Sequence, residues 1–210
     1  MKKLIVSLGL ALTLSYGDTS QDYIQGLISL SMKDYKKALV IFEDLASKGD
    51  ANSQSYMGLL YLNGEGVKQD YKKAREWYEK AATKGMAEAQ YNLGNMYLNG
   101  HGVKQDYLKA KEWYEKAAAQ GNVDAQYNLG NFYFYGDGVK QNYLKAKEWY
   151  EKVAAKGMPK AHYNLGIMYY NGFGVKQNYL KSKEWFIKAC NGGFKPGCKI
   201  INKELKQLGY

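Results

Sequence analysis

The chain has 210 residues, with 30 Lys or Arg against 20 Asp or Glu, so its formal net charge is +10. The lysines recur throughout the chain instead of gathering in one patch, which argues against a nucleic-acid partner. The two cysteines have no histidine near them and are too few for a four-ligand structural zinc site. Neither a metal nor another cofactor is therefore expected.

The beginning of the chain has the features of a secretory signal. A charged start precedes an apolar run, Leu4 to Leu14, and the small residues Ser15 and Gly17 stand at the −3 and −1 positions before Asp18. The apolar run is about half the length that crosses a bilayer. We predict a signal peptide over residues 1–17, no membrane span, and export to the periplasm or beyond the cell. A buried N-terminal helix is the alternative.

Most of the remaining chain is an internal repeat. Residues 70–105 and 106–141 align without a gap, and a fixed period in this range indicates an array of stacked supersecondary units. The most conspicuous markers are four tryptophans spaced 36 residues apart: Trp77, Trp113, Trp149 and Trp185.

Each repeat is predicted to contain two helices, A and B. In the second repeat, helix A covers 86–98, contains Gly94 where another helix must cross closely, and stops at Gly100. A loop of the form G-x-G-V-K-Q follows. Helix B is then expected to begin after an N-cap residue, which in the four repeats is Asp70, Asp106, Asn142 or Asn178. The other A helices are expected near 50–62, 122–134 and 158–170.

Helix B is expected to bury Trp113 and its equivalents and to expose an ion pair between Glu112 and Lys116. The two histidines occupy different places in their repeats. We expect His101 to be a solvated loop residue and His162 to replace a surface glutamine.

These elements predict an all-α protein, an α/α superhelical solenoid of helix-turn-helix repeats with a C-terminal capping helix near 196–208. We expect one repeat domain over 18–210. Its parts are an N-terminal helix pair (18–49), four 36-residue repeats (50–193) and the cap (194–210). In an exported protein the isolated pair Cys190 and Cys198 indicates a disulfide.

The repeat resembles the Sel1-like repeat, a relative of the tetratricopeptide repeat. The matching residues in the second repeat, which continue to Gly121, include Ala89, Leu93, Gly94, Tyr97, Gly100, Gly102, Val103, Asp106, Lys109, Ala110, Trp113 and Tyr114. The resemblance covers residues 50–193 and implies a right-handed α/α superhelix that acts as an adaptor for protein complexes.

A closer likeness is to the exported cysteine-rich Sel1-like proteins of Helicobacter and its relatives, in which each repeat typically carries a disulfide from helix B to the next helix A. Here only Cys190 and Cys198 meet that pattern. Members of that group are described as β-lactamases or penicillin-binding proteins.

A polar face on the A helices is the candidate binding surface. Asparagine is a mediocre helix former, so its repetition there suggests a use, because an amide can both donate to and accept from a peptide main chain. Three readings stay open: the amides grip a ligand, they tie neighbouring repeats together, or duplication copied them without purpose. The candidate residues are Asn92, Asn95, Asn128, Asn131, Asn164, Tyr56 and Tyr135.

No catalytic residue is expected. No serine is followed by lysine at the third position, and neither S-D-N nor K-T-G occurs, so the elements of a serine β-lactamase are absent. We predict an exported, monomeric scaffold that binds a protein or peptide on its concave face. The alternative is a penicillin-binding or weak β-lactamase-like protein acting on β-lactams or cell-wall fragments, and a purely structural spacer is a third reading.

Overall fold

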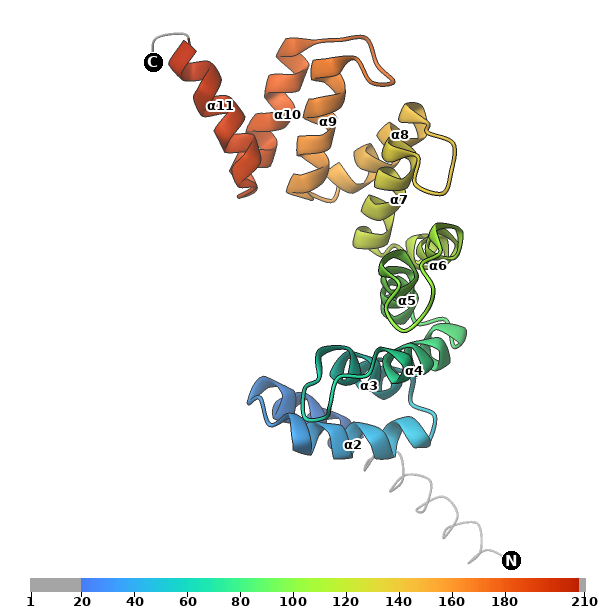
Figure 1. The fold of residues 1–210 in the computed structure, drawn as a ribbon. Coiled ribbons are helices and arrows are strands. Elements are labelled where there is room, and N and C mark those ends of the chain that lie inside the picture. Colours follow the sequence, from blue (N-terminus) through green and yellow to red (C-terminus); the bar gives the residue numbers. More distant parts are fainter. Residues whose placement is uncertain (1–19, 208–210) are drawn as a thin grey trace, which may run out of the picture. The chain divides into compact units, whose positions relative to one another are not determined.

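A computed structural model describes the backbone of residues 20–207 and the side chains of residues 20–203. The predicted signal peptide, with Ser15 and Gly17, lies outside the described residues. In the described part every regular element is a helix, which confirms the all-α repeat fold (Figure 1). A helix over residues 20–31 comes first. It is followed by α2 (Tyr35–Ser47), α3 (Ala51–Asn63), α4 (Tyr71–Thr83), α5 (Ala87–Asn99), α6 (Tyr107–Ala119), α7 (Val123–Tyr135), α8 (Tyr143–Ala154), α9 (Pro159–Asn171), α10 (Tyr179–Asn191) and α11 (Lys195–Gln207).

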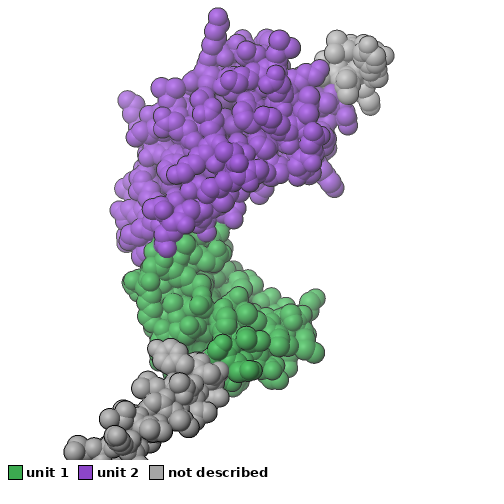
Figure 2. Space-filling view, turned by 180° about the vertical axis from the view of Figure 1, so that it is seen from behind, with its two compact units in different colours: residues 1–105 green, residues 106–210 purple. Residues whose placement is uncertain are grey.

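The chain divides into two compact units, Met1–Gln105 and Asp106–Tyr210 (Figure 2). The division falls after the loop of the second repeat, so helix A of that repeat (α5) belongs to unit 1 and helix B (α6) to unit 2. In unit 1, α3 packs against α2 and α4, and α4 packs against α5. In unit 2, successive helices from α6 to α11 pack in the same consecutive way.

The helix ends form as the capping residues predict. The Asp70 carboxylate accepts a hydrogen bond from the Lys73 backbone N–H at 3.0 Å, and the other three predicted N-caps do the same in their repeats. Gly64 ends α3 in the left-handed conformation, with φ of 74°. In the next loop a side chain on Gly102 would lie 2.4 Å from the Tyr71 carbonyl oxygen, so only glycine fits there.

The A helices cross the B helices most closely at their internal glycines, as predicted. A Cβ atom on Gly58 would lie 2.7 Å from the ring of Tyr78 in unit 1. A Cβ atom on Gly130 would lie 2.6 Å from the ring of Tyr150 in unit 2. Both rings are fully buried. Each unit therefore packs a helix B aromatic ring directly on a helix A backbone.

The prediction that the tryptophans are buried is wrong in part. Trp113 and its three equivalents are half-buried. The Lys116 ammonium lies over the Trp113 ring, 3.9 Å from its centroid, and a lysine takes this place in all four repeats. Cation–π attraction therefore holds the lysine that we had expected to pair with Glu112. The ion pairs found on the B helices are Arg75–Glu79, Lys111–Glu115 and Lys147–Glu151.

Successive repeats are joined by a polar contact that the sequence did not predict. The Gln126 side chain, which is 1% exposed, donates from Nε2 to the Ala118 carbonyl oxygen at 2.9 Å. Gln54 and Gln90 make the same bond. Each of these buried glutamines thus ties the start of one helix A to a carbonyl in the last turn of the preceding helix.

His162 takes the glutamine's place in the fourth repeat, with Nε2 3.1 Å from the Ala154 carbonyl oxygen and its ring stacked on Trp185. His162 is therefore half-buried at the contact between two successive helices and is not a surface residue. At the next equivalent positions Cys190 and Cys198 form the predicted disulfide, which joins α10 to α11. His101 stacks on Tyr71 with ring centroids 4.6 Å apart, so it is not a freely solvated loop residue.

Candidate binding site

The predicted polar face is half-buried. The five predicted asparagines of α5, α7 and α9 are partly covered, and Tyr56 on α3 is half-buried as well. Tyr135, at the end of α7, is 64% exposed and packs edge-on against its neighbour Phe134. The residues concerned are Asn92 and Asn95 on α5, Asn128 and Asn131 on α7, and Asn164 on α9.

In unit 2 the asparagines join neighbouring repeats. Asn164 on α9 donates from Nδ2 to the Tyr127 hydroxyl oxygen at 3.2 Å and lies 3.5 Å from the Asn131 Oδ1. The Tyr150 hydroxyl donates to that same Oδ1 at 2.7 Å. Burial raises the pKa of both tyrosines above the ordinary value. The four side chains form a hydrogen-bond network that supports the structural reading of Asn131 and Asn164.

Unit 1 has the same helices but lacks this network. Ser55 stands where the third repeat has Tyr127, and Leu59 stands where it has Asn131. The hydroxyl of Tyr78, the equivalent of Tyr150, is buried without a hydrogen-bond partner. In the described part of the chain the Asn92 amide, the equivalent of Asn164, makes no hydrogen bond. Two substitutions thus leave two donors unused.

The same substitutions open a groove in unit 1 between helix 20–31, α3 and α5. It has a volume of about 390 Å³. One wall is aromatic, because the Tyr56 ring stacks on Phe42 with centroids 4.8 Å apart and lies 6.3 Å from that of Tyr23. Burial and the neighbouring Tyr56 raise the pKa of Tyr23 to about 12. We call this cavity the unit 1 groove; it is lined by Tyr23, Asn52, Ser55, Tyr56, Leu59, Met86, Glu88 and Asn92.

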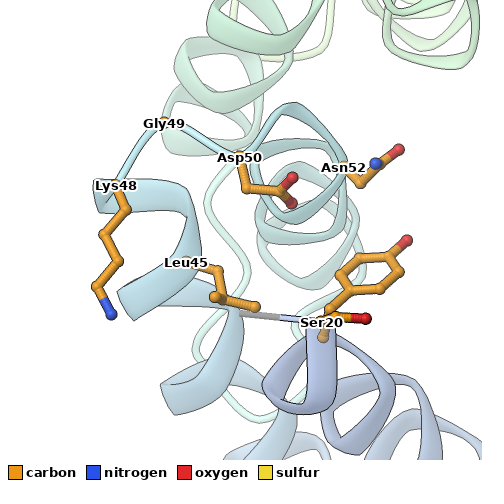
Figure 3. A pocket seen from close by; sticks show the side chains of 7 residues that line it. Ser20, Leu45, Lys48, Gly49, Asp50 and Asn52 are labelled. Carbon is orange, nitrogen blue, oxygen red and sulfur yellow. The ribbon is translucent and has the colours of Figure 1, made fainter. Parts of the chain in front are cut away.

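A second cavity of about 520 Å³ shares Tyr23 and Asn52 with the unit 1 groove and therefore adjoins it. Figure 3 shows its polar side chains, with Asp50 and Asn52 at the start of α3 and Ser20 on the first helix. The Asp50 carboxylate caps α3 by accepting from the Ser53 backbone N–H.

The sequence thus identified only part of this site. It placed Tyr56 and Asn92 on the right face, and both line the unit 1 groove. It did not identify Ser55, Leu59 or Tyr78, although their signal was visible: position 55 holds serine where the later repeats hold Tyr91, Tyr127 and Tyr163. The departure from the repeat pattern, and not the pattern itself, marks the groove.

Residues 20–203 contain no group of three or more His, Cys, Asp or Glu side chains placed to hold a metal ion. No described helix is both long and apolar enough to cross a membrane.

Comparison with known proteins agrees with the fold. The model of the Sel1 repeat matches residues 51–86, 87–122, 123–158 and 159–194. No match was found among curated proteins. A solved structure of c5321, a protective antigen present in uropathogenic Escherichia coli strains, is 35% identical with a TM-score of 0.81, and the match covers 87% of this chain. This chain spans only 40% of the length of that antigen.

Two further structures match. A Sel1 repeat protein from Oxalobacter formigenes is 31% identical over 84% of this chain and 70% of its own, with a TM-score of 0.79. Helicobacter pylori cysteine rich protein B is 28% identical over 63% of this chain and 95% of its own, with a TM-score of 0.49. Four consecutive matched repeats cover more than half of the sequence, and the chain therefore belongs to the Sel1 repeat family.

Proposed function

We propose that this protein is an exported, monomeric scaffold that binds a protein or peptide partner on the polar face of its A helices, chiefly through the unit 1 groove. Sel1 repeat proteins are generally protein-interaction scaffolds. The observation that carries the proposal is the unit 1 groove itself, where the half-buried Asn92 amide has no partner among the described residues. A ligand that supplies an acceptor to this amide gains about 0.5–1.5 kcal/mol.

Export rests on the charged and apolar beginning of the chain and on the disulfide between Cys190 and Cys198, a bond that persists in oxidising compartments. Mass spectrometry of the protein from its native cell tests it directly. A mature N-terminus at Asp18 is expected, and an intact Met1 would contradict the signal peptide.

Peptide selection with matched variants tests binding. Peptides selected from a displayed library on the purified protein should bind Asn92→Ala more weakly, while the free energy of unfolding of that variant stays unchanged. Asn164→Ala is the control: it breaks the unit 2 network, should lose about 1 kcal/mol of stability, and should keep its peptide affinity. Equal binding of every selected peptide by both variants and the native chain would remove the unit 1 groove from the proposal.

Analytical ultracentrifugation tests the monomeric state. The alternative of a penicillin-binding or weak β-lactamase-like activity has no S-x-x-K element to support it. If hydrolysis of a chromogenic β-lactam co-purified with the protein, that result would support this alternative.

A further inference from the structure

Resting on the proposed function, we infer that the unit 1 groove takes a tyrosine side chain of the partner, which occupies the place that Tyr127 fills in the third repeat. The unit 1 groove lies where the first repeat lacks its own tyrosine, since position 55 is serine. The incoming ring therefore completes a packing arrangement that the protein already uses elsewhere.

The surroundings of Tyr127 show what the missing ring would contact. Its centroid lies 5.8 Å from that of Tyr150, and its ring packs against the buried core of unit 2. In unit 1 Met86, which lines the groove, corresponds to Met158, whereas the corresponding ring, Tyr78, is fully buried and does not line the groove. An apolar cavity of about 150 Å³ already holds benzene, so the unit 1 groove, at about 390 Å³, has room for a phenol ring.

The polar atoms favour tyrosine over other aromatic residues. In unit 2 the Tyr127 oxygen accepts from Asn164. In unit 1 a phenol oxygen at the same place can accept from Asn92, whose amide lines the unit 1 groove. Phenylalanine would leave that amide unpaired.

The charge of a residue that lines the unit 1 groove indicates which kind of residue flanks the partner's tyrosine. Glu88 lines the unit 1 groove, where the fourth repeat has Lys160 at the equivalent position. A lysine or arginine beside the partner's tyrosine complements this charge.

The test compares peptides that differ in one atom. Acetyl-Arg-Tyr-Gly-amide and its Phe analogue are titrated into the purified, isotope-labelled protein and followed by NMR shifts of Asn92 and the other groove residues. We expect saturable binding of the Tyr peptide about fivefold to tenfold tighter than that of the Phe peptide, the size of one hydrogen bond. Absence of saturable shifts, or equal affinity for both peptides, overturns the inference.

Two variants separate this inference from simple folding effects. Ser55→Tyr restores the ring of the other repeats, so it should raise the thermal midpoint and abolish Tyr-peptide binding. Asn92→Ala removes the donor that meets the phenol oxygen, so the fold should persist while the preference for Tyr over Phe falls. An unchanged preference in Asn92→Ala, or retained binding by Ser55→Tyr, contradicts the tyrosine assignment.

Failure of the inference differs from failure of the proposed function. If library peptides need Asn92 yet contain no tyrosine, the scaffold function stands and the tyrosine pocket is wrong. If no library peptide binds the polar face, both are wrong.

Discussion

The first repeat, in unit 1, and the third repeat, in unit 2, share their helices, caps and close glycine crossings, but differ in how they satisfy the same polar atoms. Unit 2 uses Tyr127 and Asn131 to engage Asn164 and Tyr150. Unit 1 has Ser55 and Leu59 in place of the first two, and its Asn92 amide and Tyr78 hydroxyl have no partner in the described part of the chain. The candidate binding site of unit 1 thus lies where the third repeat has a joint between repeats.

The largest predicted effect concerns what the two units share. Gly58→Ala and Gly130→Ala each place a methyl group within about 2.7 Å of a buried tyrosine ring. Overpacking of this kind costs about 1–3 kcal/mol, and we expect both substitutions near the upper end because backbone and ring are held on both sides. Urea unfolding should show similar losses, and a clear difference between the two would mean that the crossings are not equivalent.

The next comparison is between a covalent and a hydrogen-bonded joint. Replacing Cys190 and Cys198 with serine should cost about 2–3 kcal/mol by the chain-entropy estimate for a short loop. Gln90→Ala, which removes the equivalent bond to Ala82 in unit 1, should cost about 1 kcal/mol. Hydrogen exchange should localise the first loss to α10 and α11. Equal losses in the free energy of unfolding would show that the disulfide stabilises the protein no more than the glutamine hydrogen bond does.

Exchanging the residues that distinguish the units is a direct test of the comparison. Asn131→Leu should destabilise the protein by about 2 kcal/mol, because it leaves the buried Tyr150 hydroxyl without its acceptor. Leu59→Asn should have the opposite sign and stabilise by up to about 1 kcal/mol, since it offers Tyr78 an acceptor. Chemical unfolding measures both, and a loss in both variants would contradict the assigned roles.

The smallest effect is a pH dependence at His162. Burial lowers its pKa below the ordinary value, with Lys188 adding to the shift, and the Nδ1 atom is buried without a partner. Folding thus favours the neutral ring. Its contribution to stability is complete above the unfolded pKa near 6.5 and is lost as the pH falls below that value. His162→Gln, which restores the bond of the earlier repeats, should remove this part of the decline between about pH 7 and 5. An unchanged dependence of the free energy of unfolding on pH would show that His162 does not cause this decline.

Sequence reasoning succeeded where one residue type has one structural use. Asp70 and its equivalents cap helix B, and the glycines of helix A stand at the close crossings, because both effects act within a few residues or through backbone geometry. It failed for side chains with several possible partners. The glutamine that His162 replaces was expected at the surface, yet Gln126 is buried against a carbonyl, and Lys116 was expected to pair with Glu112 but lies over Trp113.

The sequence by itself determined the Sel1 repeat fold, the helix limits to within about one residue, and the disulfide, because each follows from local pattern and repeat spacing. Only the tertiary structure decided what the asparagines do. Asn92 and Asn164 stand at the same position of equivalent helices. Their roles differ through the residues 37 and 33 positions earlier in the chain, which in unit 2 packing brings within hydrogen-bond reach of Asn164. The hydrogen-bond partner of each asparagine is therefore set by the sequence of the neighbouring helix and not by the helix that carries the amide.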